Sequence, residues 1–221
     1  MQSSLKRAAT ALALCATAMA QAAVVTIDDF NSPDVFLSDA AGGGATTSTD
    51  AVRTLSHELL AGTSTPAQYA QIGSGSFPAG SLDVSNSSGH DSEVIATWQL
   101  ANGFVPSAAQ NVNFLFNVIQ SDGNPTTLDF TFNNNALASF VIAGNTANQM
   151  VAFGLTAAQA AIVSGGGALG MRVNGVIGWD MTLDSFGVSF DAGNRVPEPA
   201  SLGLVGLALA GIGLSRRRRS A

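Results

Sequence analysis

The sequence predicts an all-β fold for residues 23–195: an antiparallel two-sheet sandwich, jelly-roll-like, with one short crossover helix. The first observation is a strict alternation of apolar and polar residues in short segments. Leu128, Phe130 and Phe132 share one face of such a segment, and the polar residues between them share the other. This period of two is typical of antiparallel strands that are buried on one side. Turn residues between the segments and a scarcity of helical patterns are the other two observations, and together they favour a sandwich.

The alternation and the β-branched residues place the expected strands in order along the chain. These strands cover residues 24–27, 94–100, 112–119, 127–132, 138–142, 170–173 and 181–190. Turn-forming residues at 121–125 and 133–135 separate neighbouring strands. Residues 38–50 are rich in Gly, Ala and Thr and predict a loose loop or an edge hairpin.

One helix is expected, over residues 157–163. Thr156 is a suitable N-cap, and Gly165 ends the pattern. Two turns are marginal in isolation, so this helix must dock on the sandwich as a crossover.

The C-terminal tail reads as a membrane segment rather than as part of this fold. Residues 200–214 carry no charge, and Arg216–Arg219 follow directly. A helix of this length spans roughly 22 Å, less than the ~30 Å hydrocarbon core, which suits a transient stop. The arginines predict that this end stays on the cytoplasmic side. Pro197 and Pro199 keep the preceding backbone extended and accessible to a processing enzyme; a permanent C-terminal anchor is the alternative.

This tail resembles the PEP-CTERM sorting signal of exopolysaccharide-producing Gram-negative bacteria. That family combines a Pro-Glu-Pro triplet, a short hydrophobic helix and an Arg-rich end, in this order. The resemblance implies recognition by an exosortase, a membrane-embedded transpeptidase-like protease, and removal of the tail. The residues that carry the motif here are Pro197, Glu198, Pro199, Arg216, Arg217, Arg218 and Arg219.

The N-terminus predicts a secretory signal peptide over residues 1–22. Lys6 and Arg7 precede an apolar stretch, and two small-x-small sites, Ala18-Met19-Ala20 and Ala20-Gln21-Ala22, allow cleavage by signal peptidase. The single cysteine, Cys15, lies inside this peptide. The mature chain therefore has no disulfide, no thiol nucleophile and no thiolate metal site.

Three segments follow from these boundaries: a signal peptide (1–22), a β-sandwich extracellular domain (23–195) and a sorting signal (196–221). The domain is strongly acidic, with fourteen Asp and Glu side chains against three arginines and no lysine. Nucleic acid and anionic membrane surfaces are poor partners for such a domain. Neutral polysaccharide or divalent cations fit it better, and an acidic surface that serves solubility alone is the simpler reading.

Enzymatic motifs are weak in this sequence. His57-Glu58 resembles the start of a zinc-protease motif, but Ala61 stands where the second histidine is needed, and no Gly-x-Ser-x-Gly elbow is present. Glu58 and Glu93 are the only glutamates of the domain, so a glycan hydrolase with paired carboxylates is the enzymatic alternative. We expect a protein that is not an enzyme.

A binding site is the better hypothesis. The first and last strands of a jelly roll commonly pair, which would bring Asp28 and Asp29 near Asp180 and Asp184 in a calcium site. The Asp29-Phe30 pair also resembles the start of carbohydrate-binding jelly rolls. Solvated aspartates that cap strand ends, with no resident cofactor, are the alternative. For stacking on sugar, Trp179 is the candidate, whereas Trp98 lies in an apolar strand and is expected in the core.

These observations predict an exported, exosortase-processed structural or adhesive protein of the cell surface or exopolysaccharide matrix. We expect it to pass through an inner-membrane intermediate and then to reach the cell surface, the outer membrane or the matrix. A calcium-supported carbohydrate-binding module is the first alternative, and the glycan hydrolase is the second.

Overall fold

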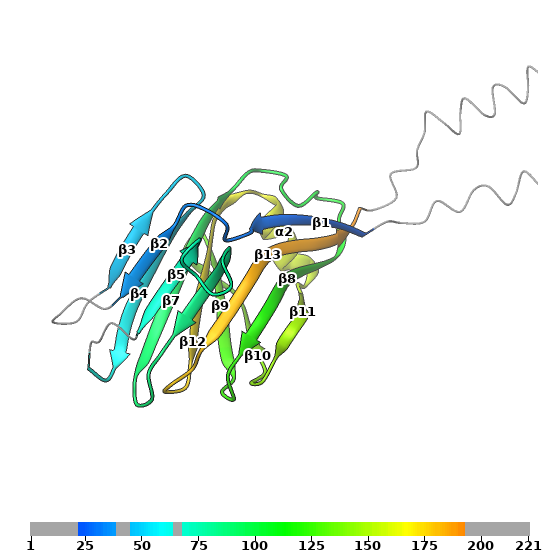
Figure 1. Cartoon of the computed structure of the whole chain (residues 1–221). Helices are drawn as coiled ribbons and strands as arrows, with labels where there is room; N and C mark the ends of the chain where they lie inside the picture. The colour runs from blue at the N-terminus through cyan, green and yellow to red at the C-terminus, as the bar shows by residue number, and fades with distance from the viewer. Residues whose placement is uncertain (1–21, 39–44, 64–67, 193–221) are drawn as a thin grey trace, which may run out of the picture. The chain divides into compact units, whose positions relative to one another are not determined.

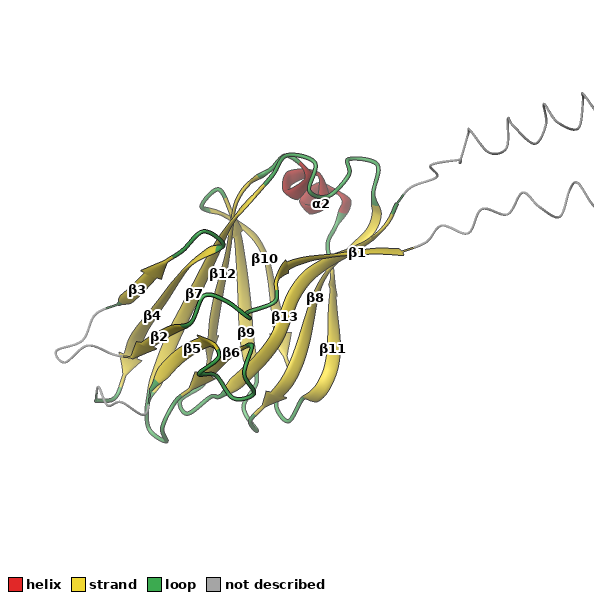
Figure 2. Cartoon of the chain, turned by 45° about the horizontal axis from the view of Figure 1, so that its top comes forward, coloured by secondary structure: helices red, strands yellow, loops and turns green. Residues whose placement is uncertain are grey.

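A computed structural model describes residues 22–38, 45–63 and 68–192. Within this part of the chain, Ala22–Asp191 form one compact unit made of two antiparallel sheets and a single short helix (Figures 1 and 2). The predicted fold class, an all-β two-sheet sandwich, is therefore confirmed. The predicted signal peptide, apart from Ala22, and the sorting signal lie outside the described residues. No helix of the described part is both long and apolar enough for a membrane span.

The first sheet, here called sheet A, has seven strands in the described chain. Its order is β11-β8-β13-β6-β5-β2, and β1 pairs with β13 off this path. The strands are β1 (Ala22–Asp28), β2 (Val35–Ser38), β5 (Tyr69–Gly73), β6 (Ser81–Ser85), β8 (Gln110–Ser121), β11 (Ala147–Gly154) and β13 (Met181–Asp191).

The second sheet, sheet B, has six strands among the described residues, in the order β10-β9-β12-β7-β4-β3. The strands are β3 (Thr46–Thr49), β4 (Arg53–Ala61), β7 (Asp91–Leu100), β9 (Thr126–Phe132), β10 (Asn135–Ile142) and β12 (Gly167–Gly175).

The pairing of the first strand with the last is confirmed. β1 runs antiparallel to β13, so that Ala22 lies opposite Asp191 and Asp28 lies opposite Phe186. The two ends of the compact unit are therefore neighbours on one sheet (Figure 1).

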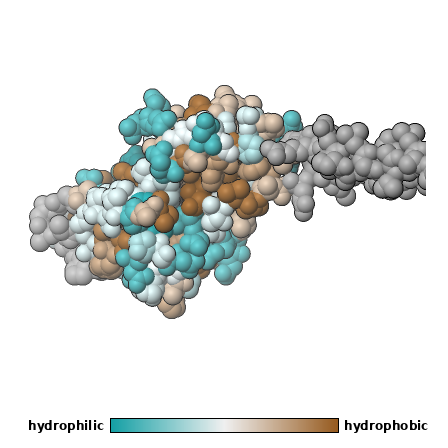
Figure 3. All heavy atoms as spheres, turned by 90° about the horizontal axis from the view of Figure 1, so that it is seen from above, coloured by the Kyte–Doolittle hydropathy of each residue, from teal (hydrophilic) through white to brown (hydrophobic). Residues whose placement is uncertain are grey.

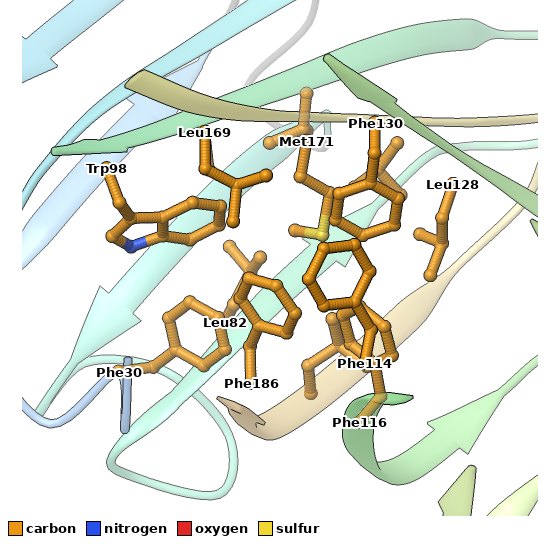
Figure 4. Close-up of a cluster of buried hydrophobic side chains, with 14 of the residues drawn as sticks. Phe30, Leu82, Trp98, Phe114, Phe116, Leu128, Phe130, Leu169, Met171 and Phe186 are labelled. Atoms are coloured by element: carbon orange, nitrogen blue, oxygen red, sulfur yellow. The ribbon is translucent and has the colours of Figure 1, made fainter. Parts of the chain in front are cut away.

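The core lies between the sheets and is rich in aromatic rings (Figure 4). Phe116 and Phe186 stack with their centroids 4.7 Å apart, and Phe114 packs on Phe130 across the two sheets at 4.5 Å. Burying each such ring stabilises the fold by about 1.5–3 kcal/mol, which is why the alternation in these strands fixes the side that faces inward.

The predicted helix is present as α2 (Ala157–Ser164), with Thr156 as its N-cap and Gly165 as its C-cap. Thr156 and Gln159 form a reciprocal capping box. The helix follows β11 of sheet A and precedes β12 of sheet B, so it is the expected crossover, and Val163 anchors it in the core.

The strands predicted from alternation are all present, each within a few residues of its expected bounds. The edge hairpin expected within residues 38–50 corresponds to β3, which pairs with β4 at the edge of sheet B. By contrast, β2, β4, β5, β6 and β11 were not predicted. Several of them are short and polar, and they are strands because neighbouring strands satisfy their backbone.

Candidate functional site

Asp28, one of the expected calcium ligands, is buried, and its carboxylate oxygens already accept hydrogen bonds from other groups of the protein. Its carboxylate accepts hydrogen bonds from Arg53 Nε at 2.5 Å, Arg53 Nη2 at 2.7 Å and Trp98 Nε1 at 2.7 Å. The backbone N–H of Phe30 donates a further bond of 2.9 Å. A carboxylate that accepts four bonds, two of them from a guanidinium, has no lone pair left for a metal.

Arg53 reaches Asp28 because the turn before β4 holds it in place. Asp50 accepts from the backbone N–H of Val52 at 2.7 Å and of Arg53 at 2.9 Å. Arg53 and Trp98 belong to sheet B, whereas Asp28 ends β1 of sheet A, so this buried ion pair joins the two sheets. The sequence shows no signal for this pairing, because the partners are 25 and 70 residues apart.

The other three predicted ligands do not join Asp28 in a metal site. Asp29 is exposed, and hydrogen bonds from Asn31 hold its pKa below the usual range. Asp184 accepts from the Asn117 amide at 2.7 Å. In the part of the chain that the structure describes, no group of three or more His, Cys, Asp or Glu side chains is placed to hold a metal ion. The expected set of Asp28, Asp29, Asp180 and Asp184 is therefore not assembled as a cluster, since its first member is bound to Arg53.

Trp179, the candidate for stacking on sugar, lies in the core and not at the surface. Its side chain is 0% exposed and its indole N–H donates to the Ser92 carbonyl oxygen at 3.1 Å. The turn that contains it folds inward, because the ring packs against Gly175, where a Cβ would lie 2.5 Å from Trp179 Cγ. The expectation that Trp98 lies in the core is confirmed.

Two stacked aromatic side chains, one exposed and one half-buried, lie instead on the outer face of sheet A, at its β2 edge. Phe36 is 55% exposed, and its ring stacks on Tyr69 with centroids 5.5 Å apart and an interplanar angle of 29°. Alternation explains the placement: Leu37, Ala70 and Ile72 of the same strands point into the core, so Phe36 and Tyr69 point outward.

Polar side chains continue this surface across the sheet. The register aligns Phe36 with Gln71, Gln71 with Asp83, and Asp83 with Thr182. Tyr69 Oη donates to Asp83 at 3.1 Å, and Thr182 Oγ1 donates to the other carboxylate oxygen at 3.0 Å. We call this surface the aromatic–acidic face; it comprises Phe36, Tyr69, Gln71, Asp83, Ser85, Asp180 and Thr182.

The electrostatics of the aromatic–acidic face are dominated by negative charge. Burial raises the pKa of Tyr69, and the negative charge of Asp83 raises it further. Burial also raises the pKa of Asp180, which Asp122 and Asp83 reinforce by repulsion, while a 2.6 Å hydrogen bond from the backbone N–H of Asn86 acts in the opposite direction. Among the described residues, neither arginine forms an ion pair with Asp83 or Asp180: Arg53 is paired with Asp28, and Arg172 with Glu93.

The loop between β5 and β6 borders this face. Gly75 lies so close to Gln71 that a Cβ there would be 2.1 Å from the amide nitrogen. Ser76 Oγ donates to the Gly73 carbonyl oxygen at 2.7 Å, which ties the loop together. Its Phe77 is 83% exposed. A hydrogen-bonded loop thus holds a second exposed aromatic ring beside the sheet.

The outer face of sheet B has a different character. Glu58 and Glu93, the candidate hydrolase pair, lie directly opposite each other on β4 and β7. However, Glu93 accepts a hydrogen bond from Arg172, and Arg172 also lies 3.6 Å from Asp129. The glutamates are therefore brought together, but one of them is held in an ion pair.

A small hollow lies elsewhere on sheet A, lined mainly by Val24, Thr26, Leu115 and Met150. Its volume of about 40 Å³ suits a water molecule rather than a sugar ring. The hydropathy surface in Figure 3 shows exposed apolar residues, in brown, next to hydrophilic ones.

Comparisons with known proteins identify the tail but not the body. The PEP-CTERM protein-sorting motif matches residues 195–219, outside the described part of the structure. No curated protein matches the chain.

Among solved structures, a family 11 carbohydrate-binding module of the cellulase Lic26A-Cel5E of Clostridium thermocellum is 9% identical, covering 79% of this chain and 98% of its own, with a TM-score of 0.37. TmCBM61, solved with β-1,4-galactotriose, is 12% identical over 68% of this chain and 90% of its own, with a TM-score of 0.30. The tailspike protein 4 of bacteriophage CBA120 is 14% identical over 68% of this chain and 19% of its own, also at 0.30. At these scores the similarities carry no argument about the ligand.

The sorting signal predicted from Pro197, Glu198, Pro199 and the terminal arginines is therefore confirmed, while the body matches no family. The chain carries a PEP-CTERM motif, which marks an exported protein that transits the membrane and is sorted by an exosortase.

Proposed function

We propose that this protein is a non-enzymatic adhesive component of the cell surface or exopolysaccharide matrix, and that it contacts polysaccharide through the aromatic–acidic face. The observation that carries the proposal is the stacked pair of Phe36 and Tyr69, held on the outer side of a rigid sheet beside Asp83 and Gln71.

The chemistry of this face suits a sugar chain. Aromatic rings offer an apolar surface to the C–H groups of a pyranose, while carboxylate and amide groups bind its hydroxyl groups. Tyr69 and Thr182 hold the nearly buried Asp83 in place, while the partly exposed Gln71 and Asp180 offer polar atoms to a ligand. A binding site on the face of a sheet suits a long polymer, bound weakly at each contact and tightly by many copies.

The position of the face along the chain also fits an adhesive role. Thr182 of this face is the second residue of β13, which ends at Asp191, just before the sorting signal in the sequence. Nine residues of extended strand separate the two points by roughly 30 Å. Thr182, on the proposed binding surface, and Asp191 thus lie at opposite ends of β13.

Calorimetric titration of the processed protein, recovered from producing cells, with the exopolysaccharide of the same organism tests this proposal. Phe36→Ala is expected to weaken binding about ten-fold or more, because it removes half of the stacked pair. Val141→Ala is the matched control: Val141 is 57% exposed, close to the 55% of Phe36, but lies on β10 of sheet B. Equal affinities of wild type and Phe36→Ala would contradict the proposal.

The proposal assigns no resident cofactor, and the same titration repeated with calcium and with EDTA tests that assignment. Heat that disappears in EDTA would restore the calcium-supported module as the better reading.

The hydrolase alternative has one observation in its favour, the direct juxtaposition of Glu58 and Glu93. It predicts release of reducing ends from the same polysaccharide and loss of that release in Glu58→Gln. The ion pair between Glu93 and Arg172 is the reason that we favour the adhesive role.

A further inference from the structure

The positive charges of the described residues are segregated from the aromatic–acidic face. Only two cationic side chains, Arg53 and Arg172, occur in the described ranges 22–38, 45–63 and 68–192. Arg53 is buried between the sheets with Asp28, and Arg172 lies on sheet B between Glu93 and Asp129. The aromatic–acidic face therefore has no lysine or arginine of its own.

Negative charge on this face is correspondingly uncompensated. Asp83 is 9% exposed and is oriented by two hydroxyl groups rather than by a cation. Asp180 lies close enough to Asp83 and Asp122 for their charges to disfavour its ionised form. A ligand that brings positive charge to this surface relieves this repulsion, and a ligand that brings negative charge increases it.

We propose that the aromatic–acidic face binds a polysaccharide of amino sugars with free amino groups. This inference rests on the proposed function and names the chemical class of its ligand. The aromatic pair defines the site, and the carboxylates decide which charge it accepts. One residue of a glucosamine polymer presents apolar C–H groups to Phe36, and a neighbouring residue presents an ammonium group to Asp83 or Asp180, which lie two and three strands further across the sheet.

Two physical effects favour the ammonium form over a neutral sugar. A hydrogen bond between an ammonium group and a carboxylate is about twice as strong as one between neutral groups. An ammonium group over the exposed ring of Phe36 gains a further cation–π attraction. Polymers of uronic acids or of phosphate-bearing sugars meet repulsion from the same carboxylates, and this face offers no arginine fork to receive them.

A pair of probes that differ only in acetylation tests the inference. We would titrate the processed protein with the β-1,4-linked tetramer of glucosamine and with the same tetramer of N-acetylglucosamine, at a pH where the amines are protonated. The free-amine tetramer is expected to bind about ten-fold tighter or more, and this preference is expected to fall with added salt. Equal affinities, or tighter binding of the acetylated tetramer, would overturn the inference.

Two carboxamide variants locate the effect on the face. Asp83→Asn and Asp180→Asn keep the size of each side chain and an acceptor oxygen but remove its charge, so each is expected to reduce the preference for the free amine several-fold. Asp129→Asn, on the outer face of sheet B, is the matched control and should leave the preference unchanged. The second variant keeps the test valid if the first does not fold.

The outcomes separate this inference from the proposed function. Exopolysaccharide binding that depends on Phe36, without a preference between the tetramers, would refute the amino-sugar inference alone. Failure of the exopolysaccharide and of both tetramers to bind would refute the two together.

Discussion

The outer faces of the two sheets both carry carboxylates, but these carboxylates have different hydrogen-bond and charge partners. On sheet B, Arg172 lies between Glu93 and Asp129 and gives both carboxylates a cationic neighbour. On sheet A, the described residues place hydroxyl and amide groups, but no arginine or lysine, beside Asp83 and Asp180, and the stacked pair of Phe36 and Tyr69 lies next to them. Carboxylates that are paired with an arginine are typical of a solvated surface. Carboxylates without such a partner, beside an exposed aromatic ring, are more typical of a ligand-binding surface.

The difference originates in the core. Among the described residues, Arg53 is the one arginine or lysine that forms an ion pair with a residue of sheet A. It lies between the sheets, where it neutralises Asp28. The domain has few arginines and no lysine. Because Arg53 is buried with Asp28, it is not available to pair with the carboxylates on the outer face of sheet A.

The largest expected effect comes from removing the buried cation. Arg53→Met leaves the buried carboxylate of Asp28 without its partner, so the free energy of unfolding should fall by about 3–5 kcal/mol. Urea denaturation of the processed protein measures this change. The control is Arg172→Met, since Arg172 is nearly half exposed in its ion pair; similar losses in both variants would contradict the distinction between the two arginines.

A smaller effect is expected from neutralising the aromatic–acidic face. The folded state raises the pKa of Asp180, so its ionised form opposes folding above that pKa. Asp180→Asn should therefore stabilise the protein at neutral pH. This gain should vanish when the pH falls below the ordinary range of an aspartate, because Asp180 is then protonated in both the folded and the unfolded state.

Thermal unfolding of Asp180→Asn and wild type across this pH range measures the difference. Asp184→Asn is a suitable control, because Asp184 lies four residues further along the chain, in β13, and accepts a hydrogen bond from the Asn117 amide. If the gain in stability of Asp180→Asn over wild type grows as the pH falls, the folded state lowers the pKa of Asp180, contrary to this prediction.

The smallest effect is expected on sheet B. Arg172→Gln removes an exposed ion pair and should lower the free energy of unfolding by at most about 1 kcal/mol, with no change in polysaccharide affinity. Denaturant titration and calorimetry measure the two quantities. A loss of polysaccharide affinity in this variant would indicate that the binding surface lies on sheet B and not on sheet A.

The fold was largely predictable because its strongest strands carry their own signal. Leu128, Phe130 and Phe132 of β9 alternate with polar residues, and α2 begins and ends at Thr156 and Gly165 as expected. The strands that were missed, such as β5 and β6, have only five residues each, too few for a period to be evident. Such strands form because their neighbours complete their hydrogen bonds, which is a tertiary effect.

The candidate site was poorly predictable for a related reason. Trp179 and Asp28 have the residue types of a binding site, but both side chains are buried. The indole N–H of Trp179 donates to the Ser92 carbonyl oxygen, and the carboxylate of Asp28 pairs with Arg53. Phe36 and Tyr69 carry no motif and lie 33 positions apart in the sequence, on strands that were not predicted. Their stacking arises only from the pairing of β2 with β5.

The sequence by itself determined the sorting signal of this protein, its all-β class and its acidic character. A sorting motif is read as a linear segment, alternation is local, and net charge is a sum, so none of them requires distant residues to meet. The tertiary structure alone decided which carboxylates are neutralised and which aromatic rings face solvent. Both depend on strand register and on which side of a sheet a residue occupies, and a shift of one residue in a strand reverses that side.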